Sequence, residues 1–148
     1  MNNHNPEEIE IRQAIEADAQ VIADLLEELG YPSKPANVLD RLRSLDRTGD
    51  LALVAVIDTQ VVGLILLHRT PFLHRPPDGR ISTLVVAQTH RGNGIGSLLV
   101  KEAEKIFCQW GCGRIELTSG AQRDAAHRFY ERLGYVEKPK RFIKIVVN

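Results

Sequence analysis

Three glycines within five residues, Gly92, Gly94 and Gly96, stand between an apolar stretch and a helix-forming stretch. Glycine removes side chains where a helix begins, and this exposes backbone N–H groups that have no partner within the helix. Those donors, together with the positive end of the helix dipole, form a site for an anion. Arg91 adds a fixed charge and a forked donor suited to phosphate. We therefore expect this stretch to hold a phosphorylated ligand, in particular a pyrophosphate.

Other glycine-rich turns fit the pattern less well. A P-loop needs a lysine before its Ser or Thr, but Gly96 is followed directly by Ser97. A dinucleotide-binding fold needs G-x-G-x-x-G near the start of its domain, whereas these glycines follow G-x-G-x-G after much of the chain. The glycines could also make only a tight connection. The apolar strand before them, the amphipathic helix after them and Arg91 together favour the anion site.

The elements that must position this turn follow from hydrophobic periodicity. Alternating or continuous apolar runs predict strands, and apolar residues at helical spacing predict helices. The order is β-α-α-β-β-β-α-β-α-β-β, and we expect one α/β (α+β) domain over residues 1–148, with a mixed sheet, helices on both faces and a flexible segment at residues 1–7. The predicted strands are 9–14, 51–57, 61–68, 81–87, 114–119, 135–136 and 142–147, and the predicted helices are 17–29, 36–47, 95–110 and 123–132.

Composition limits the function classes. A chain of 148 residues suits one domain with one core, and a formal net charge of zero provides no overall field to recruit nucleic acid or an anionic membrane. The apolar runs are too short to span a bilayer, and the N-terminal residues have no apolar targeting core. We therefore expect a cytoplasmic protein with no nucleic-acid or membrane partner.

Cys108 and Cys112 lack the further ligands that a zinc site needs. We expect no metal site there, but two small, partly buried thiols in a reducing compartment.

Residues 69–79 are rich in proline, which excludes regular structure, and they include His74 and a Phe-Leu pair that we expect to be exposed. Next to a central strand, such a loop could line a substrate site or be an ordinary solvated connection.

Two segments carry a resemblance to a known family. The run Arg91-Gly92-Asn93-Gly94-Ile95-Gly96 resembles motif A of the GNAT superfamily of N-acetyltransferases, which bind acetyl-CoA. The run from Ala125 to Tyr135, with Phe129-Tyr130-Glu131 and Gly134-Tyr135, resembles motif B of that superfamily. The resemblance implies a mostly antiparallel sheet, acetyl-CoA as co-substrate and a possible homodimer.

The same resemblance implies roles for individual residues. The backbone of a splayed central strand would meet the pantetheine arm of the cofactor at Leu84, Val85 and Val86. The pyrophosphate would lie on Arg91, Gly92, Asn93, Gly94, Ile95 and Gly96. Tyr130 would give a proton to the departing thiolate, although a core aromatic with a bonded hydroxyl would look the same. Arg123 stands where many relatives carry an asparagine that contacts the cofactor.

The general base is not assigned by the resemblance. Many relatives carry a glutamate on the central strand where this chain has Thr83, which cannot deprotonate an ammonium. Water, a free-amine substrate or another residue must serve. The candidate residues are His68, His74, Glu116 and His127.

Three functions remain open at this stage. The first is an N-acetyltransferase acting directly on a small primary amine, with some similarity to the aminoalkylphosphonate N-acetyltransferase branch around residues 72–74 and 118–130. The second is a protein acetyltransferase acting on an N-terminus or a lysine. The third is an acyl-CoA-binding sensor with weak or no catalysis.

Overall fold

The computed structural model describes residues 8–118, 124–138 and 141–146. The chain forms two compact units, Met1–Thr118 and Ser119–Asn148, and each is described by itself. The first unit contains β1 (Glu10–Gln13), η2 (Glu16–Asp18), α1 (Ala19–Leu29), α2 (Pro35–Arg43), β2 (Asp50–Ile57), β3 (Gln60–Thr70), β4 (Asp78–Val86), η3 (Gln88–His90), α3 (Ile95–Gln109) and β5 (Arg114–Leu117). The second unit contains α4 (Asp124–Arg132).

The sheet has the order β1-β2-β3-β4-β5. The first three neighbouring pairs are antiparallel, and β4 pairs with β5 in parallel. A mixed, mostly antiparallel sheet is therefore confirmed.

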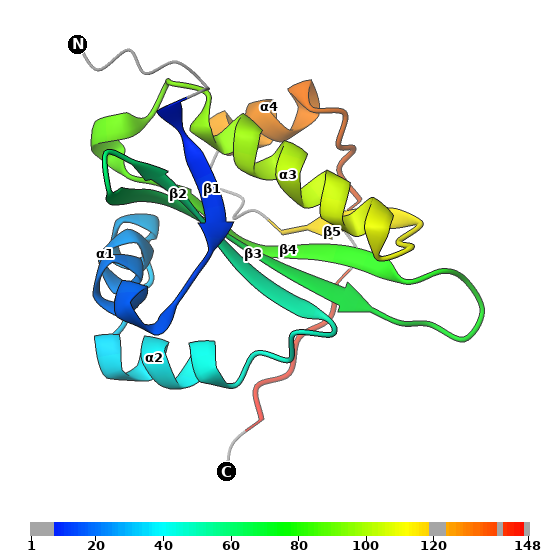
Figure 1. Cartoon of the computed structure of the whole chain (residues 1–148). Coiled ribbons are helices and arrows are strands. Elements are labelled where there is room, and N and C mark those ends of the chain that lie inside the picture. Colours follow the sequence, from blue (N-terminus) through cyan, green and yellow to red (C-terminus); the bar gives the residue numbers. More distant parts are fainter. Residues whose placement is uncertain (1–7, 119–123, 139–140, 147–148) are drawn as a thin grey trace. The chain divides into compact units, whose positions relative to one another are not determined.

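Both faces of the sheet are covered by helices in the first unit (Figure 1). Along β2, Ala52 and Val54 join the core beneath α1 and α2, while the alternate residues Leu53 and Ala55 are buried on the other face. Phe107 of α3 is 1% exposed and packs on that second face. This double burial explains why the β2 sequence is an almost unbroken apolar run.

Local chemistry sets the helix ends. Pro35 occupies the first turn of α2, where its missing N–H costs nothing, so α2 begins one residue before the predicted start. It ends at Arg43 rather than Arg47, because the Asp46 carboxylate accepts hydrogen bonds from the N–H and hydroxyl of Thr48 and forms a turn there. Gly30 ends α1 with a φ of 104°, as its position after the helix predicted.

Gly63 lies beside a bulge and at a close approach between β3 and α3. The register of β2 and β3 shifts beside it, between Ala55 and Val56. A Cβ atom on Gly63 would lie 3.1 Å from Leu99 Cδ1. The missing side chain therefore lets α3 pack closely on β3.

Two predicted strands are wrong. Residues 135–138 and 141–146 form no strand, and Phe142 is 102% exposed. Alternating apolar residues favour a strand only where a neighbouring strand accepts their hydrogen bonds, and in the described part of the chain none pairs with these residues.

The described helices include none that is both long enough and apolar enough to cross a bilayer.

Candidate active site

The turn between β4 and α3 has the backbone that the glycines predicted. Gly92 and Gly94 have φ values of 83° and 77°, and a Cβ atom at either position would meet nothing within 4 Å. Gly94 is the N-cap of α3 and has no side chain to cap it. The first N–H groups of α3, from Ile95 to Ser97, therefore have no partner within the helix.

Arg91 is held at the start of this turn. Its Nε donates to the Val86 carbonyl over 3.1 Å, which ties the side chain back to the end of β4. That bond uses one of five guanidinium donors. Arg91 directly precedes Gly92 in the chain, and the dipole of α3 also favours an anion at this turn.

The central strand β4 is paired on both edges for only part of its length. β5 pairs with it from Asp78 to Ile81, while β3 accompanies it as far as Val86. Among the described residues, the β4 edge from Ser82 to Val86 has no strand partner on the β5 side. This edge contains Leu84, Val85 and Val86 and leads directly to the glycine turn. An extended, amide-rich ligand could add to it as a further strand.

The candidate bases are not brought together as a group. His68 and Glu116 lie in one cross-strand row, because Asp50 pairs with His68, His68 with Arg80, and Arg80 with Glu116. His74 lies on the β3–β4 loop, with its ring 5.7 Å from that of Phe72. His127 belongs to α4 in the second unit.

Sequence reasoning missed two hydrogen-bond partners of His68, namely Asp50 in that row and Ser82 two residues beyond Arg80. His68 Nδ1 lies 2.8 Å from Asp50 Oδ1, and His68 Nε2 lies 2.7 Å from Ser82 Oγ. Thr83, half-buried, follows Ser82 on β4. The signal that could have found these partners is strand register, which a single sequence gives only weakly.

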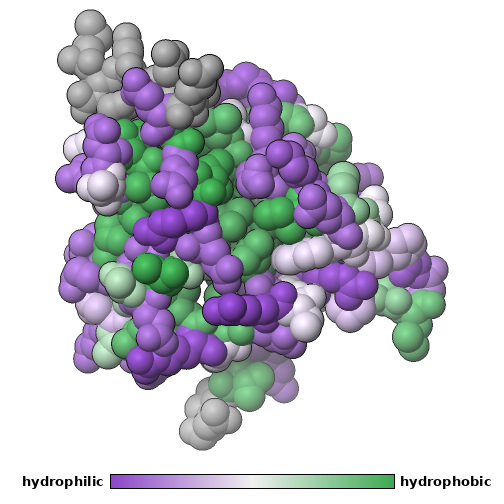
Figure 2. All heavy atoms as spheres, viewed as in Figure 1, coloured by the Kyte–Doolittle hydropathy of each residue, from purple (hydrophilic) through white to green (hydrophobic). Residues whose placement is uncertain are grey.

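The proline-rich loop is shorter than predicted. Residues 69–70 and 78–79 pair within the β3–β4 ladder, so irregular structure covers residues 71–77. Leu73 is fully exposed at its tip, and Figure 2 shows apolar surface where this loop projects from the molecule. The Arg75 guanidinium lies 4.0 Å above the Phe72 ring and also bonds to the buried Asp78. The loop is thus ordered by its own side chains.

Tyr130 lies on α4 and is half-buried. Its ring centroid is 5.3 Å from that of Phe129 and 6.2 Å from that of Tyr135. Its carbonyl accepts the N–H of Tyr135, and Gly134, with a φ of 95°, follows the end of the helix at Arg132. Arg123 lies outside the described residues.

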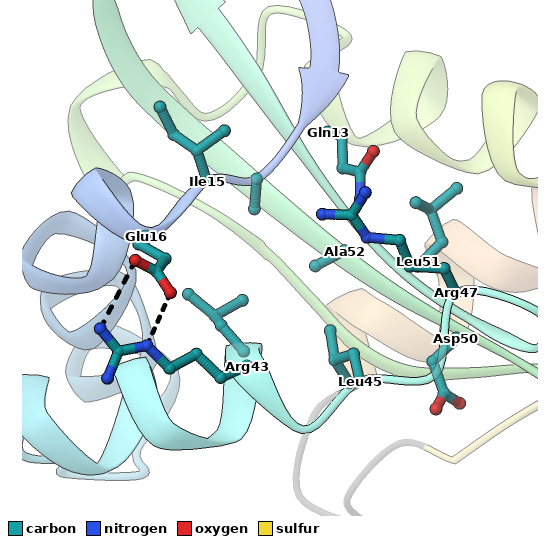
Figure 3. A pocket seen from close by; sticks show the side chains of 11 residues that line it. Gln13, Ile15, Glu16, Arg43, Leu45, Arg47, Asp50, Leu51 and Ala52 are labelled. Atoms are coloured by element: carbon teal, nitrogen blue, oxygen red, sulfur yellow. Dashed lines mark hydrogen bonds and ion pairs between the residues drawn. The ribbon is translucent and has the colours of Figure 1, made fainter.

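A pocket of about 430 Å³ lies among β1, the end of α2 and the start of β2 (Figure 3). Arg43 and Glu16 form an ion pair on its wall at 2.6 Å. Its lining takes in Asp50 but no residue of the glycine turn. It is therefore separate from the predicted anion site, and sequence reasoning gave no sign of it.

Comparison with known proteins decides the family. The model described as "Acetyltransferase (GNAT) family" matches residues 19–135, which include both the glycine turn and α4. The chain belongs to the GNAT acetyltransferase family. The resemblance seen in motifs A and B is therefore confirmed.

Two curated relatives and one solved structure are similar to this GNAT chain. An aminoalkylphosphonate N-acetyltransferase from Salmonella typhimurium is 41% identical over 92 residues, 62% of this chain and 60% of that protein. N-alpha-acetyltransferase 30 from Homo sapiens is 28% identical over 120 residues, 78% of this chain and 32% of that protein. The chain thus aligns with less than two thirds of either relative.

The solved structure is the crystal structure of a transcriptional regulator from Bacillus halodurans C-125. It is 25% identical and has a TM-score of 0.81, with 93% of this chain and 99% of that chain covered. The two chains therefore share a fold over nearly their whole lengths.

Proposed function

We propose that the protein is an acetyl-CoA-dependent N-acetyltransferase that moves an acetyl group to the primary amine of a small molecule. One observation carries this proposal: the unpaired edge of β4 leads straight into the glycine turn at the N-terminus of α3. An extended amide chain followed by a diphosphate, as in coenzyme A, fits that sequence of sites.

The cofactor would bind largely through the backbone. Its pantetheine amides would pair with the β4 edge at Leu84, Val85 and Val86. The N–H groups of the turn from Gly92 to Gly96 would bind the pyrophosphate, because they lack partners within the helix. Arg91 would add charge to the same anion. Arg123 is proposed as a further contact to the cofactor.

Tyr130 is proposed as the general acid. Collapse of the tetrahedral intermediate releases a thiolate, whose conjugate thiol has a pKa of about 8.5, while a phenol has a pKa of about 10. A phenol beside the sulfur can give up its proton as negative charge forms there. Tyr130 would regain a proton from the nitrogen that has just been acylated.

The positions of the two cysteines favour direct transfer of the acetyl group from acetyl-CoA to the amine. Cys108 is exposed on α3, Cys112 follows the end of that helix, and neither belongs to the glycine turn or to α4. Burial raises the pKa of the Cys112 thiol, which disfavours the thiolate needed for an acyl-enzyme. We therefore propose a ternary complex without a covalent intermediate.

The acceptor class rests on the relatives. The relative with 41% identity is named for aminoalkylphosphonates, which favours a small amine. The human relative favours the second candidate, transfer to a protein N-terminus. A small-molecule acceptor, a cytoplasmic location and a homodimer belong to this proposal.

A pair of glycine variants tests cofactor binding. Gly94 and Gly111 both have positive φ, 77° and 75°, and open space at the Cβ position, so alanine strains each backbone by about 1 kcal/mol. In calorimetric titrations, Gly94→Ala should weaken coenzyme A binding about tenfold or more, a loss of about 1.4 kcal/mol. Gly111→Ala should leave binding unchanged. Equal affinities for both variants and the wild type would place the coenzyme elsewhere.

Activity is tested by following release of free thiol from acetyl-CoA. The acceptor panel should include aminoalkylphosphonates, other small primary amines and peptides with free N-termini. Thiol release with small amines supports the proposal, and release only with peptides favours the second candidate. Tight coenzyme binding with no release across the panel would instead indicate an acyl-CoA sensor.

A further inference from the structure

Three polar side chains form a hydrogen-bonded chain across three strands. Asp50 on β2 meets His68 on β3 at 2.8 Å, and His68 meets Ser82 on β4 at 2.7 Å. Asp50 and His68 are direct register partners, so their side chains lie on the same face of the sheet. His68 and Asp50 are about a quarter to a third exposed, and Ser82 is exposed. The hydrogen-bonded series therefore runs from the half-buried Asp50 and His68 to the exposed Ser82.

The partners fix the tautomer of His68. A carboxylate can only accept hydrogen bonds, so the neutral imidazole must carry its proton on Nδ1, facing Asp50. Its Nε2 is then an acceptor and receives the hydroxyl hydrogen of Ser82. This leaves the lone pairs of Ser82 Oγ free to accept a proton from outside the protein. Asp50 stabilises the imidazolium that forms if His68 takes up that proton.

The backbone places Ser82 where the proposed reaction needs a base. Ser82 is the first β4 residue beyond the last β5 pair, Ile81 with Leu117. It is also the extra residue where the β3–β4 register shifts, since Leu66 pairs with Thr83 and Leu67 with Ile81. Such bulges redirect a side chain. Arg80 is the register partner of His68, and Ser82 lies two residues further along β4, so the Ser82 hydroxyl lies on the same face as His68.

The charged side chains near His68 also have hydrogen-bond partners other than His68. Arg80, the β4 register partner of His68, bonds to Glu116 at 2.6 Å and to Thr118 at 3.4 Å. Asp50 also accepts the N–H of Asp46 through its second oxygen at 3.1 Å. Figure 3 shows the Asp50 carboxylate directed away from Gln13 and Arg47 of the pocket. The groups that face His68 are thus Asp50, Ser82 and Arg80, with Glu116 behind Arg80.

We propose that Ser82, His68 and Asp50 form the proton relay that deprotonates the acceptor ammonium and replaces the glutamate missing at Thr83. This inference rests on the proposed N-acetyltransferase function. Ser82 Oγ takes a proton from the ammonium while its own hydrogen passes to His68 Nε2. The neutral amine then attacks the thioester carbon, a C–N bond forms, and the C–S bond breaks. The imidazolium returns its proton to solvent. Asp50 is a positioning residue for His68.

Steady-state kinetics with acetyl-CoA and an aminoalkylphosphonate, or another amine that the panel shows to be acetylated, tests the relay. Ser82→Ala and His68→Gln should each lower kcat by about a hundredfold, the usual size of a general-base contribution. The KM for acetyl-CoA should change by less than about twofold, since the relay does not bind the coenzyme. Ser82→Thr retains the hydroxyl and should restore most of the rate.

A double variant distinguishes a relay from two independent hydrogen bonds. The double variant Ser82→Ala/His68→Gln should be no slower than either single variant, because the residues act as one unit. Ser44→Ala is the control, since its exposed hydroxyl bonds only to the Arg41 carbonyl.

Nitrogen-15 NMR of the histidine side chains gives a test that needs no activity. Neutral His68 should be protonated at Nδ1, and Asp50→Asn should shift its population toward the other tautomer. A proton on Nε2 in the wild type would overturn the relay, because Ser82 could not then donate to it. Wild-type rates in Ser82→Ala would overturn the relay while leaving the N-acetyltransferase in place. If the wild type acetylates no amine, both the relay and the proposed N-acetyltransferase function are overturned.

Discussion

Thr83 is the residue that makes a separate general base necessary in the proposed reaction. By the resemblance to the family, it occupies the position at which many GNAT proteins carry a glutamate, and a neutral hydroxyl alone is too weak a base to take a proton from an ammonium. The adjacent Ser82 differs because it bonds to His68, whose imidazole nitrogen is a base. In the proposed relay, this region of β4 reaches a base through the side chain of the preceding residue, Ser82.

Replacing Tyr130 with phenylalanine tests the proposed general acid at this scale. Tyr130→Phe keeps the ring that packs on Phe129 but removes the phenolic proton. Turnover should fall at least about tenfold, which is about 1.4 kcal/mol of barrier, while coenzyme A still binds. The measurements are thiol release and calorimetric titration with coenzyme A.

Tyr135→Phe is the matched control, because Tyr135 lies in the same unit and its ring is 6.2 Å from that of Tyr130. It should keep nearly the wild-type rate. Unchanged turnover of Tyr130→Phe across the pH range would remove Tyr130 from the role of acid.

Individual site residues differ in how far the sequence predicts them. The glycine turn is predictable because the requirement for positive φ at Gly92 and Gly94 is local. Asp50 and Ser82 are not, since they lie 18 and 14 residues from His68 along the chain and meet it only through strand register. The bulge at Ser82 also shifts the alternation on which a face assignment depends.

The packing of α3 on β4 depends on the absence of a side chain at Gly79. A Cβ atom there would lie 2.4 Å from Phe107 Cδ1, far inside contact distance, and Phe107 is 1% exposed. The aromatic ring has no free space into which it can retreat. This contact fixes the height of α3 above the strand that carries the proposed cofactor edge.

Gly79→Ala should therefore destabilise the protein by about 1–3 kcal/mol, the usual cost of overpacking a core. Urea unfolding should show a lower midpoint with the same slope. Gly49→Ala is the comparison, because its nearest neighbour would lie at an ordinary 3.7 Å. It should change stability by less than about 0.5 kcal/mol. Similar losses for both variants would mean that the ring of Phe107 moves aside.

Among the elements, those with two covered faces or a clear helical stripe were predicted to within a few residues. The long apolar run of β2 and the spacing of α3 made both unambiguous. The C-terminal strands were wrong because alternation in residues 142–146 shows only that a strand is compatible with the sequence. A strand forms when a neighbour completes its hydrogen bonds, and the sequence cannot supply that information locally.

For the molecule as a whole, one ion pair links the edge strand to the first helical segment. Arg12 on β1 donates two hydrogen bonds to Asp18, at 2.8 and 3.0 Å, and the Ile15 N–H donates a third at 2.8 Å. Asp18 is 6% exposed. The hydrogen bonds from Arg12 outweigh burial and lower the pKa of Asp18 in the folded state.

Because folding lowers the pKa of Asp18, the free energy of unfolding depends on pH in the acid range. The ionised Asp18 contributes fully above its unfolded pKa of about 3.9, and the contribution is lost as the pH falls through the lower folded value. Asp18→Asn should lose about 1–3 kcal/mol at neutral pH and flatten the fall in stability below pH ~4. Chemical denaturation from pH 7 to pH 2.5 measures both effects. Asp24→Asn, at an exposed position on α1, should follow the wild-type curve. If Asp18→Asn keeps the full acid dependence, other carboxylates cause it, because the substituted amide side chain cannot titrate.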